Sequence, residues 1–277
     1  NVFRPTVSTV SVLLKLSMIH GYISVIALLC AINPLIKDSN GKLNDSGNYR
    51  GIGIGSLLLK IVDWIILILN EKELTSDSNQ FGFQEGASTS MCSWTAIEVV
   101  NVFRNSGSPV YACLLDYRKA FDLVNQQKMF KILIEKKVHL ILIRFLMFIY
   151  IYQKCYVKWN NSRSYSFSVN NGTRQGSVFS PSGGFGSYLD PLLKGLRESG
   201  YGCYLGIHWY GALAYADDLL LLSPSVQGLQ NLVSICENHA KENDLLFSTD
   251  PDPEKSKTKC IAFNCKTKIS LAKVYLN

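Results

Sequence analysis

The sequence predicts an α+β fold in which an antiparallel sheet carries helices packed on one face. Strand-like and helix-like segments follow one another in mixed order, two apolar strands end in carboxylates, and 47% of the 277 residues are hydrophobic. A chain of this length can bury a sizeable core, either as one large domain or as two small lobes. A sheet with helices packed on it accommodates such an order.

The first third of the chain predicts helices and one β-hairpin. Residues 1–30 form one or two apolar helical segments. A polar Gly/Asn/Asp loop then separates two short strands in the stretch INPLIKDSNGKLNDSGNYRGIGIG, which is a hairpin pattern. Residues 54–74 have helical length and a broad apolar face. Ser88 or Thr89 can cap the helix that follows, because their hydroxyls accept from free backbone amides.

The remaining elements follow from apolar pattern and from polar residues at the segment ends. They are a helix over 91–104, a strand over 109–115, helices through 152, an antiparallel pair within 155–177, a helix over 187–200, a hairpin over 211–223 turning at Asp217-Asp218, a helix over 226–243 and a strand over 259–263.

Charge and apolar runs limit the classes of partner. The net charge of +7 and the isoelectric point near 8.9 favour a polyanionic partner, either nucleic acid or an anionic membrane surface. Each long apolar run is interrupted by polar or charged residues, such as Asp63 and Arg144. These runs therefore predict buried helices and no membrane span.

Eight cysteines are scattered without a C-x-x-C pair. Their spacing favours a reduced, intracellular protein without a zinc site. Because the chain begins at Asn1 without an initiator Met, we expect it to be a fragment of a longer protein.

Three carboxylates are the candidate chemical centre. Asp116 ends a predicted strand, and Asp217 and Asp218 lie between two apolar runs in YGALAYADDLLLLSPS. If these strands are neighbours, the carboxylates converge and can bind hard divalent cations, because Mg²⁺ takes carboxylates together with substrate phosphates. Two such ions about 4 Å apart would serve a phosphoryl transfer. A pair of aspartates at a solvated turn is the alternative reading.

Six segments in order resemble the motifs of reverse transcriptases of non-LTR (LINE-type) retrotransposons. They are NYRGIGIGSLLLKI from residue 48, NQFGFQEGAST from 79, CLLDYRKAFDLVN from 113, NGTRQGSVFSP from 171, YADD from 215 and SKTKCIAF from 256. Each is short, but the ordered set extends over residues 33 to 265. The resemblance implies a right-hand polymerase fold, fingers and palm only.

The resemblance also implies subdomain ranges. They are an N-terminal helical segment over 1–30, a fingers-like subdomain over 31–108, a palm over 109–265 and the start of a connection to a missing thumb over 266–277.

The resemblance assigns catalytic roles to residues that match the family motifs. Asp116 and Asp217 match the aspartates that hold both metals, and Asp218 matches the third. The backbone carbonyl of Tyr117 would complete one metal shell. Lys257 is the candidate general acid for the leaving pyrophosphate, although a solvated surface lysine is the ordinary alternative. The implied cofactor is Mg²⁺, two ions, with Mn²⁺ as a substitute.

Substrate-binding roles follow in the same way. Phe121 matches the steric gate against a ribose 2′-hydroxyl, with core filling as the alternative. Lys37 and Arg50 match basic residues that grip the triphosphate, which suits an ammonium charge and a guanidinium fork. Gln175 and Gly176 match the nucleotide-contacting pair, where glycine permits close backbone approach.

Arg174 is expected at a nucleic-acid phosphate, and Gln84 at a template contact. The sequence departs from the family motifs at Gln84 and Glu85, which stand where Arg or Lys is frequent. It also departs at Gly51, in place of Pro, and in extra glycine after Pro181.

The function expected from the resemblance is RNA-directed DNA synthesis from deoxynucleotides. The expected partners are template RNA, a DNA primer and the missing thumb and endonuclease regions of a parent polyprotein, with no membrane. The resemblance to this family also implies an intracellular location, in a nuclear and cytoplasmic ribonucleoprotein. An inactive relic that binds RNA or protein stays open, and an unrelated phosphotransferase is disfavoured by the motif order.

Overall fold

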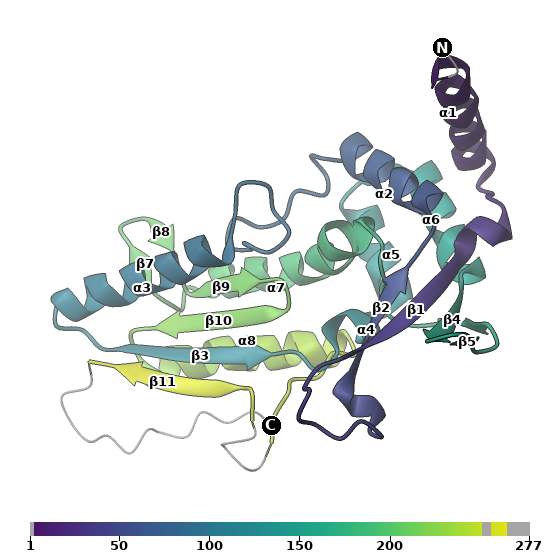
Figure 1. Cartoon of the computed structure of the whole chain (residues 1–277). Coiled ribbons are helices and arrows are strands. Elements are labelled where there is room, and N and C mark those ends of the chain that lie inside the picture. The colour runs from purple at the N-terminus through teal and green to yellow at the C-terminus, as the bar shows by residue number, and fades with distance from the viewer. Residues whose placement is uncertain (1–2, 251–255, 265–277) are drawn as a thin grey trace. The chain divides into compact units, whose positions relative to one another are not determined.

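The computed structural model describes residues 3–250 and 256–264 (Figure 1). The chain divides into two compact units, and each combines two separate stretches of sequence. The first unit comprises residues 1–75 and 126–184, and the second comprises 76–125 and 185–277. The subdomain ranges expected from the sequence are contiguous, so they cut the chain differently, and their assignment stays a prediction.

The second unit is built on an antiparallel sheet. Within the described residues its strand order is β11-β3-β10-β9, with β11 at Lys259–Phe263, β3 at Val110–Asp116, β10 at Asp218–Ser223 and β9 at Ala212–Tyr215. Every neighbouring pair is antiparallel. The α+β class and the antiparallel sheet expected from the sequence are therefore confirmed.

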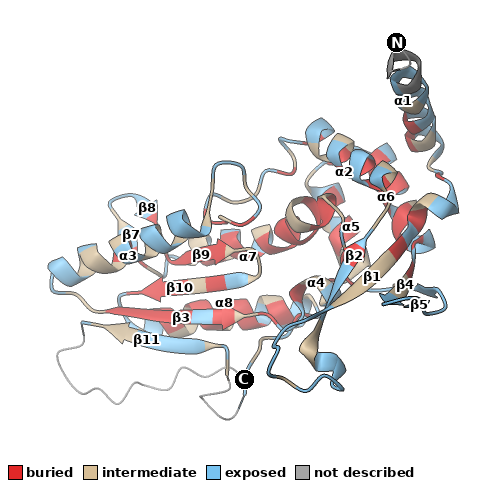
Figure 2. Ribbon diagram, viewed as in Figure 1, coloured by how far each residue is buried: buried red, intermediate tan, exposed pale blue. Residues whose placement is uncertain are grey.

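Two helices form the layer on one face of this sheet. Helix α8 (Val226–Glu242) packs against β3 and β10, and α7 (Ser187–Glu198) packs against both α8 and β9. Helix α3 (Thr89–Asn105) covers the other face, where Val99 packs with Ala112 and Leu222 in one buried cluster. Side chains alternate along a strand, so Cys113 points to the α8 face and lies near Cys236. Figure 2 shows β3 and β10 buried between these helices.

Serine hydroxyls fix where the main helices begin. The Ser88 side chain accepts a hydrogen bond from the Met91 amide at 3.2 Å, so Ser88, and not Thr89, caps α3. Ser225 accepts from Gly228 at 3.0 Å at the start of α8. Each bond satisfies one of the amides that a helix start leaves without an intrahelical partner.

The first unit contains a mixed sheet flanked by helices. The hairpin of β1 (Leu29–Ile36) and β2 (Tyr49–Ile54) is antiparallel as expected. Strand β4 (Lys154–Trp159) joins β1 in parallel, a pairing that the sequence did not predict because it links distant segments. The short strands β5 (Ser162–Arg163) and β6 (Phe167–Ser168) pair antiparallel with β4.

The helices of this unit match the apolar segments of the sequence. They are α1 (Phe3–His20), α2 (Leu57–Leu69), α5 (Gln126–Glu135) and α6 (Leu140–Tyr152), with 3₁₀ turns η1 (Val25–Leu28) and η2 (Ser46–Asn48). Helix α1 packs against α6, and α5 also contacts α6. Among the described residues, no helix combines the length and apolarity needed to cross a membrane.

Several short elements were not anticipated. The second unit contains α4 (Ala120–Leu123) and a small hairpin of β7 (Tyr204–Leu205) and β8 (His208–Trp209). The glycine-rich segment η3 (Ser180–Gly186) forms a π-helix, after which α7 begins at Ser187. The hairpin between β9 and β10 turns at Ala216 and Asp217, so Asp218 already belongs to the strand.

Candidate functional site

Two carboxylates face each other at one end of the second unit's sheet. Asp116 is the last residue of β3 and Asp218 is the first residue of β10, and the two are direct partners in the antiparallel register. Direct partners in such a pair project to the same face. The strands that carry these aspartates are therefore neighbours, which was the condition for the carboxylates to converge, and Asp217 precedes Asp218 in the turn.

The negative charge here is only partly offset. The pKa of Asp218 is raised, first by burial and then by the charges of Asp217 and Asp116, while Lys257 acts in the opposite direction. The Lys257 ammonium nitrogen lies 3.5 Å from Asp116 Oδ2. Because the Lys257 side chain is 69% exposed, solvent screens this ion pair strongly. The site therefore retains an excess of negative charge that a cation can neutralise.

A complete metal cage is not preformed. Within the described part of the chain, no group of three Asp, Glu, His or Cys side chains is arranged to hold a metal ion. The expected convergence of three carboxylates is thus seen only as the facing pair Asp116 and Asp218, since Asp217 occupies the turn. This donor set still fits Mg²⁺, which usually takes one or two carboxylates and completes its shell with water and substrate phosphates.

A buried glutamine supports the turn that carries Asp217. Gln80 Oε1 accepts hydrogen bonds from the amides of Ala216 at 3.0 Å and Gly82 at 2.7 Å, and its Nε2 donates to the Ala216 carbonyl at 3.2 Å. Ala216 has a φ of 57°, in the left-handed region that costs energy for any residue with a Cβ. The Gln80 side chain thus holds the strained peptide from both sides.

Gly82 is required beside this turn. A Cβ added at Gly82 would lie 2.2 Å from the Ala216 nitrogen, closer than any side chain permits. Nothing in the sequence of NQFGFQEGAST indicates these roles of Gln80 and Gly82. Only the pairing of residues 79–81 with β9, where Phe81 donates to the Ala214 carbonyl at 2.8 Å, makes these roles visible.

Tyr117 is anchored by packing. Its side chain is buried and stacks on Phe247, with ring centroids 4.6 Å apart. Its hydroxyl has no hydrogen-bond partner among the described residues, and burial raises its pKa well above the ordinary value. The backbone of Tyr117 also pairs with that of Phe247 in an isolated antiparallel bridge. Its two hydrogen bonds run from the Arg118 amide to the Leu246 carbonyl and from the Ser248 amide to the Asp116 carbonyl, so neither uses the Tyr117 carbonyl. The predicted metal contact of that carbonyl stays a prediction.

Phe121 lies in a group of aromatic side chains in the second unit. It is half-buried in α4, with its ring centroid 4.8 Å from Phe185 and 6.4 Å from Phe83. These neighbours fix the ring position while part of its surface stays accessible. The arrangement is compatible with the predicted gate and also with core filling.

The basic residues Lys37 and Arg50 lie together on the β1–β2 hairpin of the first unit. Arg50 is paired with Leu35 in the register, and Lys37 follows the last residue of β1. Both side chains are exposed, and the Lys37 ammonium donates to the Gly47 carbonyl at 3.0 Å. The hairpin therefore presents two exposed positive charges.

The predicted nucleotide-contacting pair packs directly on this hairpin. Gly176 has a φ of 69°, and a Cβ there would lie 2.0 Å from the Gly53 carbonyl oxygen. A Cβ at Gly53 would lie 2.4 Å from the Gln175 Cβ. Glycine on both sides is what permits this approach, and it places Gln175 against the strand that carries Arg50.

The expected phosphate contact of Arg174 is not supported. The residue is 5% exposed, and its guanidinium forms an ion pair with the fully buried Asp63 of α2. Asp63 Oδ2 also accepts from the Ser177 hydroxyl at 2.7 Å and the Val178 amide at 3.0 Å. Because the Arg174 guanidinium is buried and paired with Asp63, it is not available to a nucleic-acid phosphate. The pair instead holds the loop after Thr173 against α2.

Gln84 is partly buried, and its side-chain nitrogen has no hydrogen-bond partner among the described residues. An unsatisfied amide is compatible with the predicted template contact, which stays a prediction.

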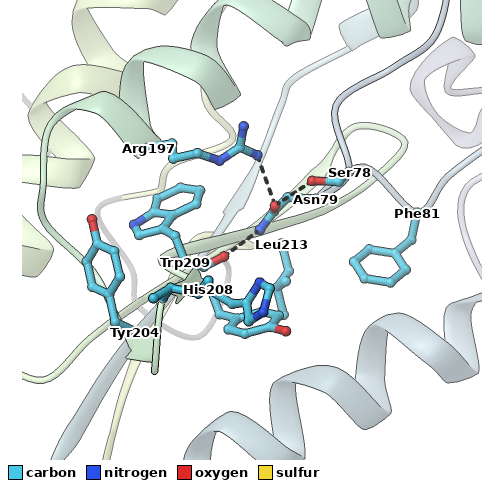
Figure 3. Close-up of a pocket in the computed structure, with 10 residues that line it drawn as sticks. Ser78, Asn79, Phe81, Arg197, Tyr204, His208, Trp209 and Leu213 are labelled. Atoms are coloured by element: carbon cyan, nitrogen blue, oxygen red, sulfur yellow. Dashed lines mark hydrogen bonds between the residues drawn. The ribbon is translucent and has the colours of Figure 1, made fainter.

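A pocket of about 480 Å³ lies near the start of β9, away from the turn that carries Asp217 (Figure 3). The Asn79 side-chain nitrogen donates to the Ala212 carbonyl at 2.7 Å, and its oxygen accepts from Arg197 at 3.1 Å. The Arg197 guanidinium also lies over the Trp209 ring at 5.6 Å. Because these polar groups bond to one another, we assign the pocket no ligand.

One family model matches most of the chain. A family model described as "Reverse transcriptase (RNA-dependent DNA polymerase)" matches residues 36–263. The "Retrovirus-related Pol polyprotein from type-1 retrotransposable element R2" of Nasonia vitripennis is 32% identical over 136 residues. That alignment covers 49% of this chain and 13% of the relative, so the chain corresponds to a small part of it.

Two solved structures share the fold at low identity. Apo telomerase from Candida tropicalis, truncated from its C-terminal domain, matches with a TM-score of 0.59 and 13% identity, over 88% of this chain and 52% of that one. Telomerase from Candida albicans in complex with a fragment of telomeric RNA matches with a TM-score of 0.54 and 11% identity, over 86% and 42%.

Removing the Gln80 side chain should destabilise the second unit. In Gln80→Ala the buried amides of Ala216 and Gly82 lose their shared acceptor, which costs about 1–3 kcal/mol of unfolding free energy. Urea unfolding followed by circular dichroism measures it. Gln227→Ala, which removes an exposed amide in α8 bonded to Asn231, is the matched control and should change the free energy by less than about 0.5 kcal/mol. Equal losses in the two variants would contradict the support of the turn by Gln80.

Breaking the buried ion pair should cost more than replacing it. Asp63→Leu leaves Arg174 charged and buried, which costs about 3–5 kcal/mol of unfolding free energy. The double variant Asp63→Leu, Arg174→Met removes both charges and should lose clearly less than the sum of its single variants. Chemical denaturation of the four proteins in the cycle measures this coupling, and additive losses would show that the two charges do not interact.

Proposed function

Because the chain belongs to the reverse transcriptase family, we propose that it is the RNA-directed DNA polymerase domain of a non-LTR retrotransposon. The expected family is confirmed by the match over residues 36–263. The reaction is transfer of a deoxynucleotide to a primer 3′-hydroxyl, with release of pyrophosphate. The single observation that carries this proposal is the facing of Asp116 and Asp218 on neighbouring strands, with Asp217 beside them.

These aspartates are the residues that would hold the divalent cation of the family. We assign the ion as Mg²⁺, with two ions per site and Mn²⁺ as a substitute, because hard oxygen donors favour such ions. A bound divalent cation supplies charge that stabilises the reacting phosphate and favours an attacking alkoxide. Gln80 keeps Asp217 in place by fixing the peptide that precedes it.

Lys257 is the group that we assign to the leaving pyrophosphate. Its ion pair with Asp116 keeps the ammonium beside the carboxylates at 3.5 Å, and its exposure leaves it free to meet a phosphate. A lysine ammonium carries three protons that can be donated. Its role is to give one proton to the leaving pyrophosphate oxygen.

The first unit supplies groups suited to a nucleoside triphosphate. Lys37 and Arg50 offer two exposed cations of the hairpin for phosphate oxygens. The Gln175-Gly176 turn, packed on Gly53, offers backbone and an amide side chain for the nucleotide.

Phe121 belongs to the second unit. Its proposed role is to exclude a ribose 2′-hydroxyl by the bulk of its ring.

The proposed partners are template RNA and a DNA primer, together with further regions of a longer polyprotein. The net charge of +7 makes binding to these polyanions dependent on salt concentration. An intracellular ribonucleoprotein, nuclear and cytoplasmic, is the proposed location, and a membrane is not among the proposed partners.

Asp217→Asn should abolish synthesis without weakening RNA binding. Loss of a metal-holding carboxylate is expected to lower primer extension by more than about 100-fold, since loss of the groups behind such ligands already costs about 10- to 100-fold. Extension on an RNA template with Mg²⁺ or Mn²⁺ measures activity, and fluorescence anisotropy measures RNA affinity.

Glu135→Gln in α5, which removes an exposed carboxylate, is the matched control and should retain activity. Equal extension by wild type and Asp217→Asn, or loss of RNA binding in the variant, would contradict the metal role. RNA binding without extension by the wild type would instead favour an inactive relic.

Phe121→Ala should admit ribonucleotides. Removing the ring opens the space that a 2′-hydroxyl needs, so the ratio of kcat/KM for dNTP over rNTP should fall by at least about 10-fold. Single-nucleotide incorporation measures the ratio. Phe167→Ala, which removes a partly exposed ring from β6, should leave it unchanged. An unaltered ratio of kcat/KM in Phe121→Ala would show that this residue does not act as the steric gate.

A further inference from the structure

Two cysteines face each other across the edge of the second unit's sheet. Cys260 of β11 is the direct partner of Cys113 of β3 in the antiparallel register, and Figure 1 shows β11 alongside β3. Direct partners in such a pair have Cα atoms roughly 4.5–5.5 Å apart, within the range of about 4.4–6.8 Å that disulfides span. Both residues are free thiols in the structure.

The two thiols interact and differ in character. Hydrogen bonding with Cys113 lowers the pKa of Cys260, whereas the same contact, together with burial, raises that of Cys113. Cys260 is exposed, while Cys113 is completely buried. Since the thiolate is the nucleophile, Cys260 is both the more reactive and the more accessible of the two.

From this geometry we propose that Cys113 and Cys260 are a reversible oxidation site, which closes to a disulfide on reaction with a low-molecular-weight disulfide such as glutathione disulfide. The site lies outside the groups assigned to nucleotide transfer and does not depend on that assignment.

The reaction proceeds by two exchanges. The Cys260 thiolate attacks one sulfur of glutathione disulfide, the S–S bond of the oxidant breaks, and one glutathione thiolate leaves. The Cys113 sulfur then attacks the Cys260 sulfur, the mixed disulfide bond breaks, and the departing glutathione thiolate takes up the proton of the Cys113 thiol. Two protein thiols are oxidised, and one glutathione disulfide is reduced to two thiols.

The bond would tie the edge strand to the centre of the sheet. Lys257 lies three residues before Cys260, and Asp116 lies three residues after Cys113. In the observed register these offsets bring the Lys257 ammonium to the Asp116 carboxylate. A disulfide would therefore lock β11 in the register that pairs these two groups. A disulfide between directly opposed strands is also easily reduced when strained, which suits a reversible site.

A second facing pair provides an internal comparison. Cys30 of β1 is the register partner of Cys155 in β4, and Cys30 is 0% and Cys155 3% exposed. An oxidant in solution cannot reach either sulfur in the folded protein. We therefore expect this pair to stay reduced under conditions that oxidise Cys113 and Cys260.

Peptide mapping of the full 277-residue chain tests the proposal. Trypsin leaves Cys260 and Cys265 in one peptide, so the experiment uses Cys265→Ser as its background. After incubation with glutathione disulfide and alkylation of free thiols, we expect two fewer alkylated cysteines. We also expect peptide 105–118 to be linked to peptide 260–266, and dithiothreitol to restore both thiols.

Variants in the same background complete the test. Cys260→Ser changes an exposed residue, so it should fold normally by circular dichroism and lose the cross-link entirely. Cys92→Ser, in α3 with no cysteine opposite it, should retain the cross-link. Cys113→Ser should stop at a glutathione adduct on Cys260. A free Cys113 after oxidation, a link from Cys113 to Cys236, or a Cys30–Cys155 link in place of the expected one would overturn the proposal.

Discussion

The mutual repulsion of like charges at the ends of β3 and β10 is the constraint on which the second unit depends. Asp116 and Asp218 face each other in register, and Asp217 follows Ala216 in the turn between the strands. Burial and these neighbours raise the pKa of Asp218, so the arrangement costs folding energy in the absence of a cation. Lys257 offsets part of that cost, and its high exposure keeps its contribution small.

Glycines that allow two backbone segments to approach closely are a second constraint in both units. Gly82 lies against the Ala216 nitrogen in the second unit, and Gly53 lies against Gly176 in the first. Any side chain at these positions would force the neighbouring backbone away. Buried polar groups then fix the resulting geometry, with Gln80 bonded to the peptide of Ala216 and Asp63 bonded to the loop of Arg174. The groups proposed to bind substrate thus rest on polar contacts inside each unit.

Much of this fold follows from the sequence, because its elements have clear local signals. Apolar patterns predicted α3 and α8, with a cap at Ser88 or Thr89 for α3, and the strand at 259–263 was predicted with its exact bounds. Asp116 was expected at the end of a strand and it ends β3, but its register partner Asp218 became visible only in the structure. Pairings between distant segments could not be predicted, such as β4 beside β1. Arg174 shows the same limit, since its burial depends on an aspartate more than a hundred residues earlier in the chain.

The proposed function requires the facing aspartates to hold a divalent cation when substrate is present. Electron paramagnetic resonance measures this when Mn²⁺ is titrated into the protein with an RNA template, a chain-terminated DNA primer and a complementary dNTP. We expect saturable Mn²⁺ binding by the wild type and its loss in Asp116→Asn, with template binding retained. Equal Mn²⁺ binding by the two proteins would contradict the claim.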